Sequence, residues 1–522
     1  MRKTLALLSI AGLVATPLIA HAGASQAELE RKIEDLSRQL EELKAQVSKQ
    51  NTTINKQNEA ISNYGGKVDS MDSMLEEKSE KWDLASRFQF SGDFRARGDY
   101  YKASNALPSG TSIYNAKTGQ MTTAGNQEND TILTNRLRLN MDVKATENIE
   151  FKGRLAMYKA WGMESAPDNI AGGFPVFDGS TTRTPSDSAL RVDRAFVNWN
   201  NIGGLPVWFS IGRRPTSDGP PAQLRMNYDE RMATPLAYMD YPFDGLTLGY
   251  GYNWGNDALG AGRIRFCYGR GFENGLQTDT DPLWNSDTDF AGFNWDVFQQ
   301  GSRFLNIQVF GAFNLFNYPS FNSDFVNYAA GFSPSAGGYG DRKNVGNVYH
   351  TAAVYMDKFK ALNYFISGGW SRTDPNENGM FNDPFSPTPN TNAENGYSFY
   401  AGIRYDIDQL GLKVGAEYNY GSKYWISFSP GHDDLYMSKL ATRGNAYELY
   451  LIYDLPTGEK LSKYANAFIR LGWQYYDYNY SGYFDWNMRP YALGSEKAQL
   501  QMLGQNPVES ANQIYMTFEV TF

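Results

Sequence analysis

Charged side chains gather in one proline-rich stretch of the sequence, where they could filter solutes. The stretch carries four arginines and three carboxylates, at Arg213, Arg214, Asp218, Arg225, Asp229, Glu230 and Arg231. Pro215, Pro220 and Pro221 restrict the backbone between them. Charged groups that line a narrow passage of low dielectric select solutes by size and charge. The chemistry that this pattern favours is therefore selection of small polar solutes.

A second group of basic residues lies on the polar sides of early segments that alternate between apolar and polar residues. Its members are Arg95, Arg97, Arg136, Arg138, Lys152 and Arg154. If the polar side faces a watery lumen, this basic wall faces the carboxylates of the 213–231 stretch across a constriction. The other interpretation is that these side chains snorkel or lie at a solvated rim.

Residues that could carry catalysis or bind a metal are few. After the leader, the histidines are His350 and His432, and neither stands in a recognisable motif for a nucleophile and its base. Residues 279–289 contain four aspartates, and calcium takes oxygen ligands of this kind, but EF-hand spacing is absent and a solvated acidic loop is the simpler interpretation. We therefore predict no enzyme, no metal site and no cofactor.

The elements that position these residues are strands, as the segment 513–522 shows most clearly. Ile514, Met516, Phe518, Val520 and Phe522 alternate with polar residues, which is the period of a β-strand. In a membrane barrel one face of such a strand meets lipid and the other meets the lumen. We expect Phe518 and Phe522 to form a signal read by the β-barrel assembly machinery. An ordinary half-buried edge strand is the alternative.

The same alternation recurs from residue 86 to the end of the sequence. Strands are expected near 88–97, 133–143, 148–161, 190–200, 206–213, 244–253, 262–270, 289–298, 304–314, 346–357, 361–372, 397–408, 411–421, 442–453, 464–479 and 512–522. The connections alternate between long and short, as the outer loops and periplasmic turns of a barrel do. The fold class predicted is an all-β, antiparallel, up-and-down transmembrane barrel of about 16 strands.

Composition agrees with a barrel in an outer membrane. Aromatic residues make up 15% of the 522 residues, with 35 Tyr. The mean hydropathy of −0.52 nevertheless shows that the chain as a whole is polar. Barrels combine aromatic girdles with a polar lumen and polar loops. The net charge of −9 argues against a nucleic-acid partner, and the single Cys267 excludes a disulfide framework.

The N-terminal region reads as an export signal followed by a coiled coil. Arg2 and Lys3 precede an apolar run and small-residue cleavage sites, so residues 1–22 are expected to be a signal peptide. Residues 27–81 carry an apolar heptad seam that starts at Leu29, which predicts a periplasmic coiled coil. Gly65 and Gly66 could mark a hinge or a break. A solvated single helix is the alternative to a coiled coil.

One motif adds a resemblance to these patterns. The run from Ile211 to Pro221, with Arg213, Arg214, Pro215, Asp218 and Pro220 in it, resembles a motif of outer-membrane porins of Gram-negative bacteria that are known mainly as a domain of unknown function. Those proteins look similar throughout, with a signal peptide, a short coiled coil and a barrel. The resemblance implies that the barrel of this chain spans residues 86–522. In general porins the third long loop, here 214–243, folds into the lumen and narrows it. The resemblance implies no particular substrate.

Together these patterns predict a porin that passes small hydrophilic solutes or ions by passive diffusion. The partners expected are copies of the same chain, most plausibly in a homotrimer, the lipid of the outer membrane and the assembly machinery. The alternative is a structural barrel that tethers the envelope through the coiled coil or sheathes an electron-transfer partner. A haem-attachment C-x-x-C-H motif is absent from the sequence, so an electron carrier would be a separate protein.

Overall fold

The structure is a computed structural model of the chain, in which two compact units, residues 1–86 and 87–522, are described separately. It describes residues 26–115, 120–163, 185–228, 231–233, 235–273, 286–317, 343–429, 431, 434, 438–459, 462, 464–482 and 486–522. The expected signal peptide lies outside this range.

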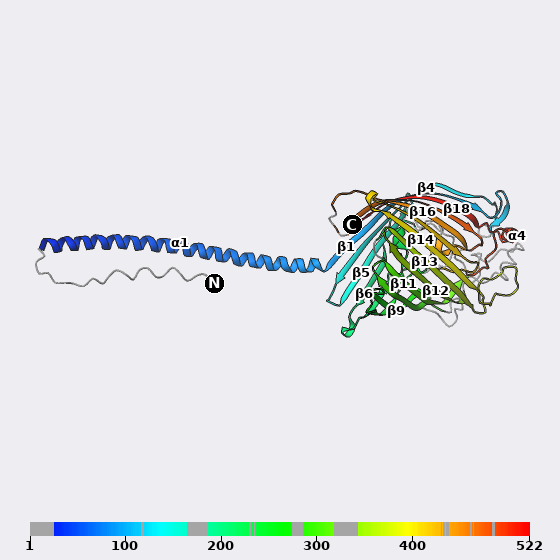
Figure 1. The fold of residues 1–522 in the computed structure, drawn as a ribbon, viewed down its shortest axis with the longest axis horizontal. Helices are drawn as coiled ribbons and strands as arrows, with labels where there is room; N and C mark the ends of the chain where they lie inside the picture. Colours follow the sequence, from blue (N-terminus) through cyan, green and yellow to red (C-terminus); the bar gives the residue numbers. More distant parts are fainter. Residues whose placement is uncertain are drawn as a thin grey trace. The chain divides into compact units, whose positions relative to one another are not determined.

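The first unit contains a single long helix, α1, from Gln26 to Ser86 (Figure 1). The apolar side chains of its expected heptad seam are more than half exposed at Leu29, Ile33 and Leu36. The helix continues through Gly65 and Gly66, where the sequence had suggested a possible break. The coiled coil itself stays a prediction. None of the helices in the described part of the chain is both long and apolar enough to cross a membrane.

The second unit is a closed antiparallel barrel of 16 strands, as predicted (Figure 1). Its strands are β1 (Phe88–Asn105), β4 (Gln127–Lys144), β5 (Ile149–Ala160), β6 (Arg191–Trp199), β7 (Val207–Arg213), β8 (Asp244–Asn253), β9 (Ala261–Phe272), β10 (Thr288–Gln300), β11 (Arg303–Asn317), β12 (Lys343–Phe359), β13 (Leu362–Pro375), β14 (Asn395–Ile407), β15 (Leu412–Gly421), β16 (Gly444–Asp454), β17 (Asn466–Tyr478) and β18 (Val508–Thr521). Consecutive strands pair with each other, and β18 pairs with β1 to close the ring.

Short helices and one hairpin complete the second unit. They are β2 (Ser112–Asn115), β3 (Gln120–Thr123), η2 (Ile202–Gly204), α2 (Ala222–Arg225), η3 (Asp408–Leu410), η4 (Lys439–Ala441) and α4 (Lys497–Met502). Around the hairpin, the sequence had predicted strands only over 88–97 and 133–143, with a long connection between them. Instead β1 and β4 run further before the hairpin, because their backbones stay paired as far as Ala103 and Gln127. The polar residues on both faces of 127–130 had hidden that extension.

The two ends of the barrel differ in their connections. Short connections such as 145–148, 301–302 and 360–361 lie at one end, called here the turn end. Long connections such as 214–243 and 422–443 lie at the other, the loop end. Outward-facing side chains are apolar and exposed, among them Ile211, Leu248, Phe293, Ile366, Ile403, Leu449, Leu471 and Met516. An apolar outer surface on a closed antiparallel barrel is what a lipid bilayer requires.

Candidate functional site: a loop across the barrel lumen

The described residues of the connection 214–243, between β7 and β8, lie inside the barrel. Asp218 pairs with Arg138 of β4 at 2.9 Å, and the Gln223 side chain donates to the sulfur of Met356 of β12 at 3.4 Å. β4 and β12 stand eight places apart in the ring of 16 strands. A segment that contacts opposite sides of a closed ring must cross its lumen. We call this segment the crossing loop.

Local sequence explains the shape of the crossing loop. The Asp240 carboxylate accepts a 2.8 Å hydrogen bond from the backbone nitrogen of Asp218, which ties the two limbs of the loop together. Gly219 lies where these limbs meet, and a Cβ there would stand 1.8 Å from the carbonyl oxygen of Pro235. Only glycine allows so close an approach. The loop is therefore held in one folded shape as it crosses the lumen.

One end of the crossing loop is held by the basic residues of β4 and β5. Asp93 of β1 pairs with Arg138 at 2.8 Å and with Arg136 at 3.2 Å. Arg138 also reaches Asp218 of the loop, and Arg154 lies 3.6 Å from the same carboxylate. We call this group, completed by Asp193, the Asp218 cluster. The loop acid and the wall bases, which the sequence analysis expected to face each other across a constriction, are here in direct contact.

A β-bulge brings two further charged residues into this cluster. In the pairing of β5 with β6, Arg154 lies opposite Arg194 and Leu155 lies opposite Val192, so Asp193 is the extra residue. A bulge lets neighbouring side chains leave the strict alternation of a strand. Asp193 forms an ion pair with Arg154, and Arg194 donates to the backbone oxygens of Ser217 and Met232 at 3.2 and 3.1 Å.

The middle of the crossing loop is held by charges of opposite sign. Arg225 pairs with Asp434 at 2.7 Å and with Glu448 of β16 at 2.9 Å, and all three side chains are buried. Lys439 pairs with Glu448 at 2.5 Å and also with Glu417 of β15. We call these five residues the Arg225 cluster. Here the crossing loop supplies an arginine, and the acids come from β15, β16 and the connection 422–443.

The other residues expected to line a pore are distributed unevenly. Arg95 and Arg97 are buried inside the barrel, and Arg97 pairs with Asp99 at 2.8 Å. Arg214 lies over the ring of Phe196 at 5.3 Å. Arg213 pairs at 2.9 Å with Asp244, whose side chain is 57% exposed, which sets it apart from the buried clusters.

Three expected features fall wholly or partly outside the described residues. They are the carboxylates Asp229 and Glu230, the histidine His432 and most of the acidic stretch 279–289. Within the described part of the chain, no group of three or more acidic, histidine or cysteine side chains could hold a metal ion.

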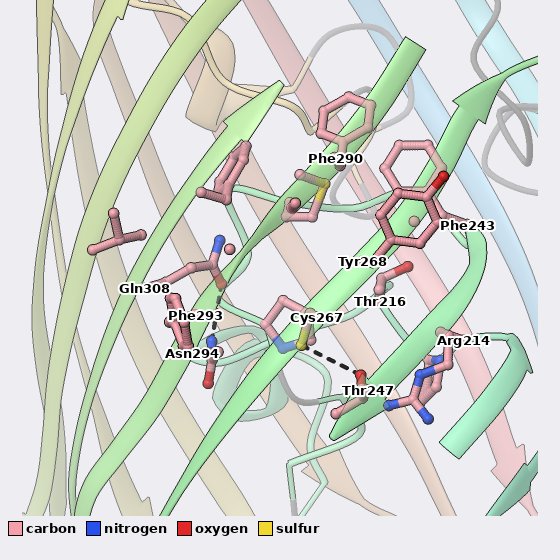
Figure 2. Close-up of a pocket in the computed structure, with 18 residues that line it drawn as sticks. Arg214, Thr216, Phe243, Thr247, Cys267, Tyr268, Phe290, Phe293, Asn294 and Gln308 are labelled. Carbon is pink, nitrogen blue, oxygen red and sulfur yellow. Dashed lines mark hydrogen bonds between the residues drawn. The ribbon is translucent and has the colours of Figure 1, made fainter. Parts of the chain in front are cut away.

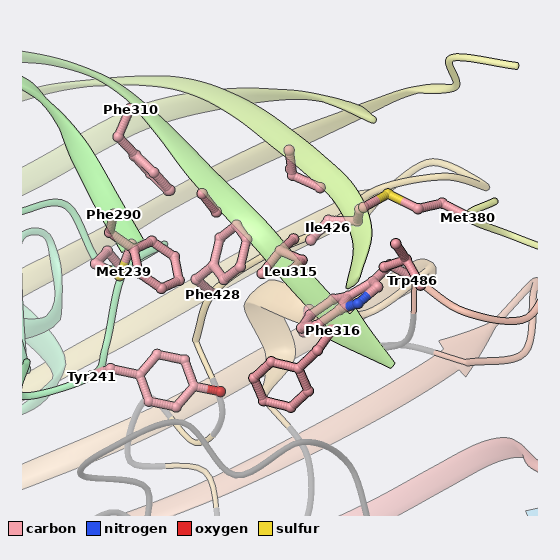
Figure 3. Packing of buried hydrophobic residues seen from close by; sticks show 14 of the residues in the cluster. Met239, Tyr241, Phe290, Phe310, Leu315, Phe316, Met380, Ile426, Phe428 and Trp486 are labelled. Atoms are coloured by element: carbon pink, nitrogen blue, oxygen red, sulfur yellow. The ribbon is translucent and has the colours of Figure 1, made fainter. Parts of the chain in front are cut away.

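The lumen beside β10, β11 and β12 is filled by apolar side chains, which the sequence analysis did not predict. Four loops contribute to this filling, through Met239, Met380, Phe428 and Trp486 among others (Figure 3). They pack on inward-facing residues of the wall, which include Phe290, Phe310, Leu315 and Val348. From the sequence alone, an apolar residue on a barrel strand is expected to face lipid, because its partners in the lumen are not known. The period-2 pattern therefore could not predict this apolar core.

A small cavity of about 80 Å³ remains between the crossing loop and β8 to β11 (Figure 2). Phe243 and Phe290 stack at 4.6 Å on one side of it, and the hydroxyl of Thr247 lies 3.4 Å from the sulfur of Cys267 on another. Its walls are mostly apolar, so it extends the apolar filling rather than the charged clusters.

His350 of β12 is enclosed by rings inside the barrel. It is fully buried, with Phe310 stacked at 4.8 Å and Trp425 at 5.2 Å between ring centroids. Neither of its nitrogens has a hydrogen-bond partner among the described residues. His350 therefore has no hydrogen-bonded nucleophile, and its position is that of a packed core residue.

Phe522 lies at the closing seam of the barrel. Its backbone exchanges hydrogen bonds of 2.8 and 3.0 Å with Gly92 of β1, and its ring occupies the space beside that glycine. Phe518 is 44% exposed on the outer face of β18. Their role as an assembly signal stays a prediction.

Sequence reasoning missed several residues of the two clusters. Glu519 pairs with Arg470 at 3.0 Å and also approaches Arg136, while Glu448, Asp434 and Lys439 hold the loop from β16 and from 422–443. One signal was available: Glu448, Arg470 and Glu519 each place a charged side chain on the inward face of a regular strand. Their partners depend on the ring order, which is not visible in the sequence.

A closed barrel with an apolar outer face, crossed inside by a charged loop, is a porin-like transmembrane barrel. The chain belongs to the family of proteins of unknown function DUF3373, whose model matches residues 126–522. This match confirms the resemblance carried by the 211–221 motif. A search of curated proteins gave no match.

Solved structures of porins share a loose likeness with the chain. One is OmpF of Salmonella typhi in complex with daunomycin, at 10% identity and a TM-score of 0.39, covering 83% of this chain and 97% of that one. Another is outer-membrane expressed OmpT of Vibrio cholerae, at 10% identity and a TM-score of 0.38, covering 83% and 97%. A third is the in-vitro folded trimer form of Vibrio cholerae OmpT, at 11% identity and a TM-score of 0.37, covering 83% and 99%.

Proposed function

We propose that this protein is an outer-membrane channel through which small hydrophilic solutes or ions diffuse passively. The observation that carries the proposal is the crossing loop, which spans a closed barrel and brings charged side chains to its wall at the Asp218 and Arg225 clusters. A charged constriction inside a membrane barrel selects solutes by size and by charge.

The passage runs along the charged sector of the wall, formed by β1, β4, β5, β6 and β18. Apolar side chains of four loops fill the sector beside β10 to β12, so water and ions are excluded there. At the turn end of the charged sector a polar cavity of about 460 Å³ lies under the crossing loop. The path past Asp218 is narrow because its carboxylate is in contact with Arg138.

The expected surroundings of the channel follow from its outer face and from α1. The apolar outer face favours lipid of the outer membrane, where closed antiparallel barrels of this size occur. Leu36, Leu40 and Leu43 of α1 are more than half exposed, so partner helices would bury their seam. A homotrimer with a periplasmic coiled coil is the assembly we propose, inserted by the β-barrel assembly machinery.

A structural barrel is the second candidate, and the apolar filling is the observation that favours it. Trp425, Phe428 and Trp486 are almost fully buried, as they would be in the core of a soluble protein. A barrel whose lumen is packed in this way could tether the envelope without conducting. The same packing disfavours a sheath for an electron-transfer partner, because the chain's own loops already occupy that part of the lumen.

Recording from the purified full-length protein in planar bilayers tests the proposal. We expect discrete open levels, and we expect their current to fall when small uncharged polymers that fit the passage are added. A matched preparation of heat-unfolded protein is the control. Silent bilayers containing folded protein, verified by heat-modifiable migration on gels, would contradict the channel and favour the structural barrel.

A further inference from the structure

The polar cavity at the turn end is lined by more bases than acids. Arg138, Lys152, Arg154, Arg194 and Arg231 lie on its walls, against Asp93 and Asp142 among the described residues. Its position at the start of β1, the end of β4 and the start of β5 makes it an entrance to the charged sector. Some of these bases form ion pairs with carboxylates, and others do not.

In the Asp218 cluster, three carboxylates serve three arginines. Asp93 pairs with Arg136 and Arg138, Asp218 with Arg138 and Arg154, and Asp193 with Arg154, while Glu519 from outside the cluster approaches Arg136. Arg194 is the fourth arginine, and it donates hydrogen bonds to two backbone oxygens. Its Nε atom is buried with no hydrogen-bond partner among the described residues. A guanidinium that donates to carbonyl groups stays positively charged and can still bind an anion.

Arg231 provides a second cation with little matched charge. Its nearest carboxylate oxygen belongs to Asp296, at 3.8 Å, and that carboxylate already pairs with Arg263 and Arg265. One acid is thus shared by three guanidinium groups. The Cζ atom of Arg231 lies over Phe304, 3.6 Å from the ring centroid, which is a cation–π contact.

Tyr228 adds a neutral donor to the same cavity. Its hydroxyl oxygen accepts a 3.0 Å hydrogen bond from Arg138, which leaves its own proton to be donated elsewhere. Burial and the nearby Asp93 raise the pKa of Tyr228, which lies on the crossing loop, to about 12. The hydroxyl is therefore protonated at physiological pH.

We propose that this cavity binds small oxyanions, carboxylates or phosphates, between Arg194 and Arg231. The inference rests on the proposed channel and names the class of solute that the channel favours. Guanidinium groups bind both kinds of oxyanion with paired, charge-assisted hydrogen bonds. Arg194 comes from the wall and Arg231 from the crossing loop, and both line the cavity at the entrance to the narrow path.

Calorimetric titration of the detergent-solubilised full chain tests the site. The probes are citrate, inorganic phosphate and, as an uncharged solute, glucose. We expect both anions, or one of them, to bind and glucose not to bind. The stronger anion identifies whether carboxylates or phosphates are the preferred class. Binding should weaken at high salt, since screening shortens the reach of the arginine charges.

Three variants locate the binding. Arg194→Gln and Arg231→Gln should each weaken the anion by about tenfold or more, because each removes a charged hydrogen-bond donor. Arg194→Lys keeps the charge and should bind more tightly than Arg194→Gln. Arg303→Gln is the matched control, since Arg303 is a half-exposed arginine at the turn end that pairs with Asp357, and its binding should equal that of the native chain.

The outcomes separate the site from the channel. Folded protein that conducts in bilayers but binds neither anion, or that binds equally well in Arg194→Gln and Arg231→Gln, overturns the site and leaves the channel. Protein that binds the anions at these arginines but does not conduct supports the site and overturns the channel. If a glutamine variant fails to fold, block of the native channel by citrate decides instead, and absence of block overturns the site.

Discussion

Asp218 and Arg225 lie seven residues apart on one loop and form ion pairs with different sectors of the barrel wall. Asp218 contacts Arg138 of β4, whereas Arg225 contacts Glu448 of β16, four places further along the ring. In the first contact the loop carries the negative charge, and in the second it carries the positive charge. Asp218 and Arg225 therefore cannot exchange their sectors of the wall. The loop is thereby fixed in both position and direction across the lumen.

Asp218→Asn should loosen the first of these attachments. Arg138 and Arg154 would lose a buried carboxylate, and leaving buried charges unpaired costs about 3–5 kcal/mol. We expect a lower unfolding temperature, measured by circular dichroism, and a larger single-channel current. Asp244→Asn is the control, because Asp244 pairs with Arg213 while more than half exposed and should change stability by about 1 kcal/mol or less. Equal effects of the two changes would contradict the assigned role of Asp218.

Arg225→Gln should release the middle of the crossing loop. Glu448 would keep the Lys439 ammonium and Asp434 the Lys439 backbone nitrogen, but both would lose their shared arginine, again at a cost of about 3–5 kcal/mol. The expected result is a larger and noisier current, with a shift toward cations because the negative charges of Asp434 and Glu448 gain influence. Arg372→Gln, an exposed arginine of β13, is the control. Unchanged current and reversal potential would show that the loop does not narrow the path.

Substitutions on the seam of α1 should weaken the oligomer and leave the barrel folded. Leu36→Asn together with Leu43→Asn removes two large apolar side chains from the seam, whereas Arg38→Asn together with Glu41→Asn changes polar positions of the same helix. Chemical crosslinking measures the oligomer, and heat-modifiable migration measures the folded barrel. If the seam variant crosslinks as well as the control, α1 does not hold the subunits together.

Phe522→Ala should lower the amount of folded barrel in cells severalfold. The ring of Phe522 packs beside Gly92 at the closing seam, and the terminal aromatic is the expected signal for assembly. Phe385→Ala is a matched control, because Phe385 is 44% exposed and Phe522 is 46% exposed. Gel migration after membrane extraction reports the folded fraction. Equal yields of folded barrel from both variants would contradict the role of Phe522 as an assembly signal.

The sequence was sufficient to predict the strands and the position of the crossing loop. Period-2 alternation predicted about 16 strands, and the predicted loop 214–243 lies between the end of β7 at Arg213 and the start of β8 at Asp244. Alternation works here because each strand turns one face to lipid and the other to the interior, and most strands carry polar residues on the inward face.

The contents of the lumen could not be predicted in the same way. Phe310 faces inward although it is apolar, because Phe428 from a loop more than 100 residues away packs against it. Asp193 and Arg194 both face the interior because of a bulge that no local pattern marked. Such contacts depend on which strands are neighbours across the lumen, and this is a property of the closed ring.

The seam between β1 and β18 has a consequence for assembly. It joins Gly92 to Phe522 and Tyr101 to Gln513, so its partners are more than 400 residues apart. Until this seam forms, an otherwise complete sheet has two open edges, whose unpaired backbone groups cannot be satisfied by lipid. The last pairing therefore commits the whole barrel to the bilayer at once, and a nascent sheet with open edges is the state most exposed to aggregation and to proteases.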